Sequence, residues 1–109
     1  AGGMLESHIV KSMTRKLKRV YGDDFYFYKT HGSADQVRGL PDLIGVYRGR
    51  FIGLEVKRPG KRATPLQAFT MQRITAAGGY ATVVHSFEEA QDFLSTVPVP
   101  PGEATEERD

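Results

Sequence analysis

Two acidic residues and a lysine, Asp42, Glu55 and Lys57, border a pair of apolar runs that are joined by Arg48-Gly49. Gly49 can take the positive φ of a tight hairpin turn, so this stretch is predicted to be a β-hairpin. If Arg48 and Gly49 are the central turn residues, counting outward places Asp42 opposite Glu55, with Cβ atoms ~5 Å apart. Side chains alternate along a strand, so Lys57 points the same way as Glu55. The three side chains therefore converge at the open end of the hairpin.

Two carboxylates at this separation repel each other unless a cation lies between them. A divalent metal ion meets that requirement, because Mg²⁺ and Mn²⁺ prefer oxygen ligands. The alternative is that Glu55 and Lys57 form an exposed ion pair at the end of a strand, which would contribute little. The alignment of Asp42 and the basic residues that follow Lys57 favour a metal site.

The sequence around these residues resembles the PD-(D/E)xK nuclease signature, in which Pro41-Asp42 is followed after twelve residues by Glu55-Val56-Lys57. Three longer motifs are similar to the virus-type replication-repair nuclease (VRR-NUC) domain, in its small stand-alone phage and bacterial type: Gly39-Leu40-Pro41-Asp42-Leu43, Glu55-Val56-Lys57-Arg58-Pro59-Gly60 and Thr64-Pro65-Leu66-Gln67. The resemblance covers residues 5–93 and implies a restriction-endonuclease-like fold. It also implies a metal-dependent, structure-selective DNA endonuclease, active on branched DNA such as four-way (Holliday) junctions.

A set of site residues follows from the resemblance. The implied catalytic residues are Asp42, Glu55, Lys57 and Gln67. The implied ligands of Mg²⁺ or Mn²⁺ are Glu6, Asp42, Glu55 and the backbone carbonyl of Val56. Lys57 would orient the attacking water and stabilise the transition state. Two simpler roles stay open, because Glu6 could serve only the dipole of its helix and Gln67 could serve only a capping box with Thr64.

The distribution of charge points to a polyanionic partner. The chain of 109 residues has a net charge of +2, but residues 103–109 hold four acids and one arginine, so the rest carries 14 basic and 9 acidic residues. Basic residues cluster at 11–19 and 57–62, and each cluster alone could merely solvate the surface. The candidate DNA contacts are Lys11, Arg15, Lys29, Arg38, Arg58, Lys61 and Arg62. The polar loop 30–40 also carries His31 and Asp35 beside the expected site.

Local signals predict the remaining elements. Apolar residues at helical spacing predict a helix over 5–20, and an aromatic run predicts a strand over 25–29. Thr64 with Gln67 and Ser86 with Glu89 are capping-box pairs that open two further helices, and residues 80–84 form a further strand. The side chains expected to pack the helix after Thr64 onto the sheet are Leu66, Phe69, Ile74 and Ala77.

These elements give an α/β fold of order α-β-β-β-α-β-α. A helix between the third and fourth strands is the usual requirement for parallel pairing, so the central sheet should be mixed, with helices on both faces. We expect one nuclease domain at 4–97. Residues 1–3 are interpreted as a cloning remnant, and 98–109 as a disordered Pro-rich and acidic tail.

Several classes of protein are excluded or disfavoured. The absence of cysteine rules out disulfide frameworks and thiolate metal sites, and His8, His31 and His85 lack zinc-ligand spacing. No membrane span, serine hydrolase motif or nucleotide-binding glycine loop is present, so we expect no membrane and no small-molecule substrate. The expected location is the cytoplasm of a bacterium or a phage-infected host cell. A homodimer is expected, because cutting a four-way junction needs two symmetric nicks. The alternative function is a nucleic-acid-binding module that kept the fold and lost catalysis.

Overall fold

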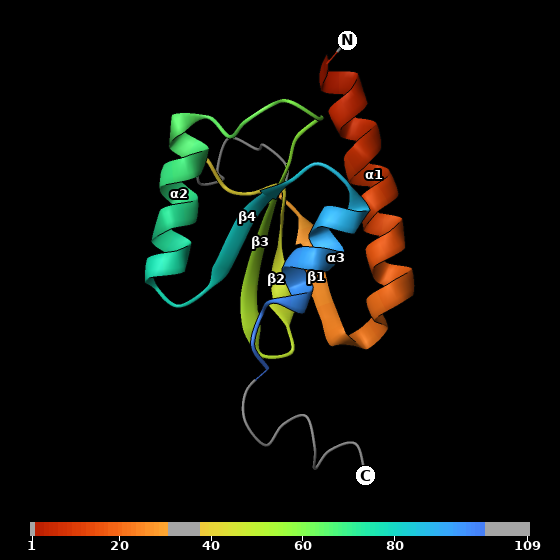
Figure 1. Ribbon diagram of the computed structural model, residues 1–109, viewed down its shortest axis with the longest axis vertical. Helices are drawn as coiled ribbons and strands as arrows, with labels where there is room; N and C mark the ends of the chain where they lie inside the picture. Colours follow the sequence, from red (N-terminus) through yellow and green to blue (C-terminus); the bar gives the residue numbers. More distant parts are fainter. Residues whose placement is uncertain (1, 31–37, 100–109) are drawn as a thin grey trace.

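The computed structural model describes residues 2–30 and 38–99, which form a single mixed sheet between two helical layers (Figure 1). The elements, in chain order, are α1 (Gly2–Tyr21), the 3-10 turn η1 (Gly22–Asp24), β1 (Phe25–Lys29), β2 (Leu43–Tyr47), β3 (Arg50–Val56), α2 (Pro65–Ala76), β4 (Tyr80–Val84) and α3 (Phe87–Ser95). This order and the α/β class confirm the predicted fold. No helix in these described ranges is both long enough and apolar enough to cross a membrane.

The four strands lie in the order β1-β2-β3-β4. The pairs β1–β2 and β2–β3 are antiparallel, and β3–β4 is parallel, as the intervening helix α2 predicts. Arg48 (φ 48°) and Gly49 (φ 90°) are the central residues of the hairpin turn, and Tyr47 pairs with Arg50. Positive φ at both positions is the signature of a type I′ turn, whose twist matches that of the strands. The predicted register is therefore confirmed.

The hydrophobic core lies between the sheet and the layer of α1 and α3 (Figure 1). Alternate side chains of β1, β2 and β3 that face this layer are buried, as the period of two requires, and β4 contributes Val84. The fully enclosed contributors are Met13 and Leu17 from α1, Leu43, Ile52, Leu54 and Val56 from the hairpin, Val84 from β4, and Ala90 and Leu94 from α3. This core holds α1 against the end of the hairpin that carries Asp42 and Glu55.

Helix α2 lies on the opposite face of the sheet, and its packing differs from the prediction. Leu66 and Phe69 are exposed, at 47% and 56%, and Ala77 is also exposed. The half-buried side is instead Gln67, Thr70, Met71 and Ile74, spaced three and four residues apart along one helix face. Small residues on the sheet let α2 approach, since a Cβ placed on Gly53 would lie 3.5 Å from Ile74 Cδ1. Of the four expected contacts, only Ile74 faces the sheet.

Parts of two predicted loops lie outside the described residues. His31 and Asp35 fall in 31–37, and most of the predicted tail falls in 100–109. Within the described part, α1 extends beyond the predicted 5–20 at both ends.

Candidate active site

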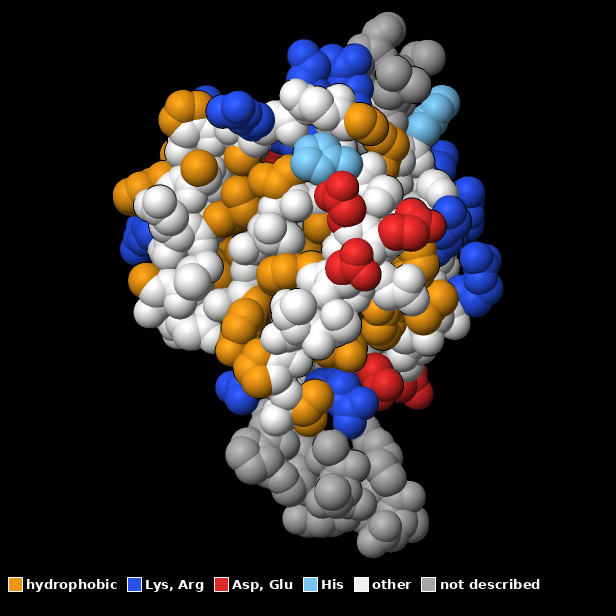
Figure 2. Space-filling model, in the orientation of Figure 1, with side chains coloured by type: hydrophobic (Ala, Val, Ile, Leu, Met, Phe, Trp, Pro, Cys, Tyr) orange, Lys and Arg blue, Asp and Glu red, His pale blue; other side chains and the backbone are white. Residues whose placement is uncertain are grey.

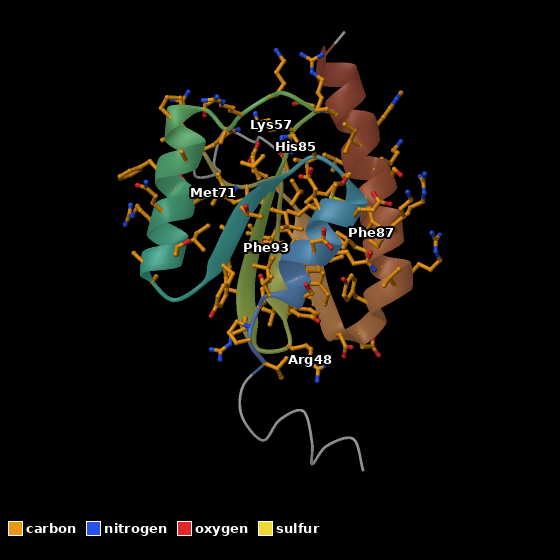
Figure 3. All side chains as sticks on the ribbon, in the orientation of Figure 1. Arg48, Lys57, Met71, His85, Phe87 and Phe93 are labelled. Carbon is orange, nitrogen blue, oxygen red and sulfur yellow. The ribbon has the colours of Figure 1, made fainter. Side chains whose placement is uncertain are left out.

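Asp42, Glu55 and Lys57 meet at the open end of the hairpin, opposite the Arg48-Gly49 turn. The last registered pair is Leu43–Leu54, which leaves Asp42 and Glu55 as the next facing positions. Oδ2 of Asp42 accepts a hydrogen bond of 2.8 Å from the backbone N–H of Val56. Nζ of Lys57 lies 3.6 Å from Oε2 of Glu55, and Figure 3 shows Lys57 at this end of the sheet. The structure thus brings together the three side chains that the hairpin count predicted to converge.

Glu55 is the most unusual charge in the site, because its residue is only 2% exposed. Its Oε1 atom finds no hydrogen-bond partner among the described residues. Burial, together with the carboxylate of Asp42, raises the pKa of Glu55 to about 7, although the Lys57 ammonium acts in the opposite direction. Burial also raises the pKa of Asp42, against the effect of the Val56 N–H. A buried carboxylate with an unpartnered oxygen, next to the half-buried carboxylate of Asp42, fits a divalent cation, which would supply the missing charge.

A cavity of about 270 Å³ opens beside Asp42, between α1 and the ends of β1 and β3. Its lining combines carboxylates, lysines and hydroxyls with the end of strand β3: Glu6, Ser7, Val10, Lys11, Lys29, Thr30, Asp42 and Val56. The carboxylates can hold a cation, while the two lysines can meet an anion. The chemistry of this lining suits a phosphate group bound next to a metal ion.

Glu6 reaches this cavity from α1, as its predicted position on the helix allowed. Its carboxylate lies 3.9 Å from Nε of Arg58, and its charge contributes to the raised pKa of Asp42. Among the described residues, no group of three or more Asp, Glu or His side chains is clustered closely enough to hold a metal ion. Two carboxylates and a backbone carbonyl would suffice for Mg²⁺, which usually keeps several waters. The role of Glu6 as a further ligand stays a prediction.

Gln67 forms the capping box of α2, which confirms the simpler of its two roles. Its Oε1 accepts from the backbone N–H of Thr64 at 2.8 Å, and Oγ1 of Thr64 accepts from the backbone N–H of Gln67 at 3.2 Å. A catalytic role for Gln67 stays a prediction.

The candidate DNA-binding residues divide by location. Lys11 and Lys29 line the cavity, and Arg58 lies beside Glu6 at its edge. Lys61 and Arg62 are exposed on the loop after Lys57, and Arg15 is exposed on α1. Figure 2 shows Lys and Arg side chains gathered at the end of the molecule where this loop lies and along α1. Arg38, by contrast, lines a separate groove with Phe69 and Arg73 on α2.

Two residues that contribute to this region carried no clear signal in the sequence. Thr30 holds the segment before β2, since its Oγ1 donates to the carbonyl of Pro41 at 2.6 Å and its N–H donates to the carbonyl of Asp42 at 2.8 Å. His85 contacts the loop after Lys57 through the carbonyl of Lys61. Both contacts depend on strand order and loop path. A polar residue directly after a strand is the only hint that the sequence offered.

Comparisons with known proteins agree with the fold. The chain is 30% identical over 94 residues to "Putative nuclease p44" of Acyrthosiphon pisum secondary endosymbiont phage 1, covering 85% of this chain and 91% of that protein. One solved structure, a "VRR_NUC domain", matches with a TM-score of 0.65 and 21% identity over 85% of this chain and 97% of its own. Another, a "VRR_NUC domain protein", matches with a TM-score of 0.70 and 19% identity over 87% and 92%. A scan of family models gave no match.

Proposed function

The chain belongs to the VRR-NUC family of nucleases, and we propose that it is a metal-dependent endonuclease that hydrolyses phosphodiester bonds in DNA at Asp42, Glu55 and Lys57. One observation carries the proposal: a buried carboxylate, Glu55, has an unpartnered oxygen beside a second carboxylate and a lysine. A protein that only bound DNA would gain nothing from acids facing a phosphate. The expected setting is the cytoplasm of a bacterium or phage-infected cell.

The proposed cofactor is Mg²⁺ or Mn²⁺. Asp42, Glu55 and the carbonyl of Val56 would hold it, with Glu6 as a further ligand from α1. When bound, the ion would neutralise charge on the scissile phosphate and lower the pKa of a bound water. Before the ion binds, Glu6 pairs loosely with Arg58, so binding would release that arginine toward the DNA backbone.

Lys57 is proposed to act directly on the reacting groups. Its ammonium is held close to Glu55, and its side chain is only 13% exposed. A fixed cation in a partly dehydrated site stabilises developing negative charge far better than one in water. Lys57 would therefore orient the attacking water and stabilise the transition state. Gln67, held at the start of α2, is proposed to contribute its free amide group at the rim.

The DNA backbone is proposed to cross the cavity between α1 and the loop after Lys57. Lys11 and Lys29 would meet a phosphate inside the cavity, and Lys61 and Arg62 would meet its neighbours outside. Each such contact neutralises one phosphate and adds to the salt dependence of binding.

A cleavage experiment tests this function. End-labelled branched and linear duplexes are incubated with Mg²⁺, Mn²⁺ or chelator, using wild type, Asp42→Asn and the matched control Glu88→Gln, an exposed acid on α3. We expect metal-dependent cleavage by wild type and the control, and none by Asp42→Asn, which should still bind DNA in chelator. Binding without cleavage by wild type under every condition would instead support the non-catalytic alternative.

The proposed substrate is branched DNA, cut by a homodimer that presents two sites. An uncovered area of the sheet on the face of α2 supports self-association, because four large side chains on it are exposed: Tyr26, Tyr28, Val46 and Phe51. Sedimentation equilibrium should give twice the 12.1 kDa chain mass, and Val46→Asp should give monomers. If the wild type is a monomer both with and without junction DNA, flaps or single nicks would become the favoured substrates.

A further inference from the structure

His85, directly after β4, joins two parts of the molecule that are far apart in the sequence (Figure 3). Its Nδ1 lies 2.9 Å from Oε1 of Glu89 on α3, and its Nε2 lies 3.0 Å from the carbonyl oxygen of Lys61. The backbone N–H of His85 also donates to the same Glu89 oxygen, at 2.9 Å. One imidazole therefore bridges α3 and the basic loop 57–64.

The carboxylate of Glu89 binds His85 and does not take its expected capping role. Oγ of Ser86 accepts from the backbone N–H of Glu89 at 3.1 Å, which is one half of the predicted capping box. The other half would place the Glu89 carboxylate on the N–H of Ser86. That carboxylate instead contacts the backbone and the ring of His85. The prediction of a full capping box at Ser86 is corrected accordingly.

Both partners of the imidazole are hydrogen-bond acceptors only. A carboxylate and a carbonyl cannot donate, so the two short contacts are both satisfied only when each ring nitrogen carries a proton. The Lys61 carbonyl and the Glu89 carboxylate raise the pKa of His85. Other charged or titratable side chains near the ring are His8 and Lys16 on α1 and Glu88 on α3, which line the same groove. The bridge is therefore strongest with His85 as an imidazolium.

The loop that His85 holds carries the cations next to the catalytic lysine. Its two ends are fixed, because the Lys57 N–H donates to the Val84 carbonyl at 3.0 Å and Thr64 caps α2. Between these ends the described hydrogen bonds and ion pairs are few: the Lys61 N–H donates to the Arg58 carbonyl at 3.0 Å, and Arg58 lies 3.9 Å from Glu6. Both Lys61 and Arg62 are otherwise exposed. The ring of His85 therefore supplies the contact that fixes the middle of this loop to the helical layer.

We propose that His85, oriented by Glu89, is a positioning residue that holds the basic loop 57–64 in place to bind the DNA backbone next to the active site. It acts through the Lys61 carbonyl and does not touch the substrate. The proposal rests on the proposed function, because the loop is assigned there to DNA. The proposal assigns a role to His85 that the geometry of Asp42, Glu55 and Lys57 does not indicate.

The test measures DNA affinity by fluorescence anisotropy in chelator, in a Glu55→Gln background that removes a second group titrating near neutral pH. We expect the dissociation constant to rise with pH when His85 is present. His85→Asn should bind about fivefold or more weakly at low pH, with a flatter pH profile and a smaller salt slope. The matched control His8→Asn removes a histidine of the same groove and should change none of these.

A conservative variant separates positioning from folding. Glu89→Gln keeps an oxygen that accepts from His85 but removes the charge, so the midpoint of the pH profile should fall while low-pH affinity is retained. With otherwise wild-type enzyme, His85→Asn should raise KM more than it lowers kcat. An unchanged affinity and pH profile in both variants, or a loss confined to kcat, would overturn the proposal. Absence of DNA binding in every variant would instead refute the proposed function.

Discussion

Replacing Glu55 with glutamine tests whether the buried charge of Glu55 lowers the free energy of unfolding of the metal-free protein. The pKa of Glu55 rises from 4.5 to about 7 on folding. The folded state therefore binds the proton more tightly than the unfolded state between these two values, so stability is full below pH 4.5 and falls as the pH rises through 7. At ~1.36 kcal/mol per pKa unit, the charged carboxylate costs about 3 kcal/mol at pH 8.

Glu55→Gln removes this cost because the amide stays neutral. The free energy of unfolding, measured by urea titration in chelator, should fall for wild type between pH 5 and pH 8 by about 2 to 3 kcal/mol relative to Glu55→Gln. Comparing the change with pH cancels any constant effect of the new amide. Glu88→Gln, at an exposed position, should follow wild type at both pH values.

Addition of Mg²⁺ completes the experiment without measuring cleavage. A cation bound by Glu55 stabilises only the folded state, so millimolar Mg²⁺ should restore the stability of wild type at pH 8 and leave Glu55→Gln nearly unchanged. A difference between the two proteins that does not vary with pH would refute the burial argument. An equal response of both proteins to Mg²⁺ would refute the assignment of Glu55 as a ligand.

Three other substitutions probe separate parts of the molecule. Lys57→Met should bind DNA but lose ~10²-fold or more in single-turnover cleavage rate, whereas a loss of affinity alone would make Lys57 a phosphate contact. Lys29→Gln should weaken DNA binding in chelator and reduce the slope of log affinity against log salt concentration by about one. Arg19→Gln, on the exposed side of α1, is the control, and an unchanged slope for Lys29→Gln would show that Lys29 does not contact DNA. Gly45→Ala should lower the free energy of unfolding in urea by ~1–3 kcal/mol or more, because the added Cβ would lie 2.5 Å from Cα of Phe27. Near-wild-type stability would mean that β1 moves away easily.

Local rules were sufficient for the hairpin that carries Asp42 and Glu55. Its turn chemistry and its period-two pattern act over adjacent residues, so the register that aligns Asp42 with Glu55 could be counted directly. The parallel pairing of β3 with β4 followed from the position of α2 between them. Neither rule depends on contacts between residues that are far apart in the sequence.

Contacts between distant elements were beyond local rules. Leu66 and Phe69 are apolar, but the side of α2 that meets the sheet depends on where small residues such as Gly53 allow it to approach. The bridge from His85 to the Lys61 carbonyl depends in the same way on the path of a loop that has no periodic pattern. A family resemblance named the proposed catalytic residues but gave no indication of either contact.

The position of the turn has a consequence for finding related proteins by sequence. Twelve residues separate Asp42 from Glu55, and the two-residue turn divides them into equal arms that end on the same face. One extra residue in either arm would shift one acid by a single position and direct it to the opposite face of the sheet. In hairpins that keep a two-residue turn and no bulge, the number of residues between the two acids must therefore be even. This rule can separate active members of the family from chance matches to the motif. A homologue with an odd number should contain a three-residue turn or a compensating bulge.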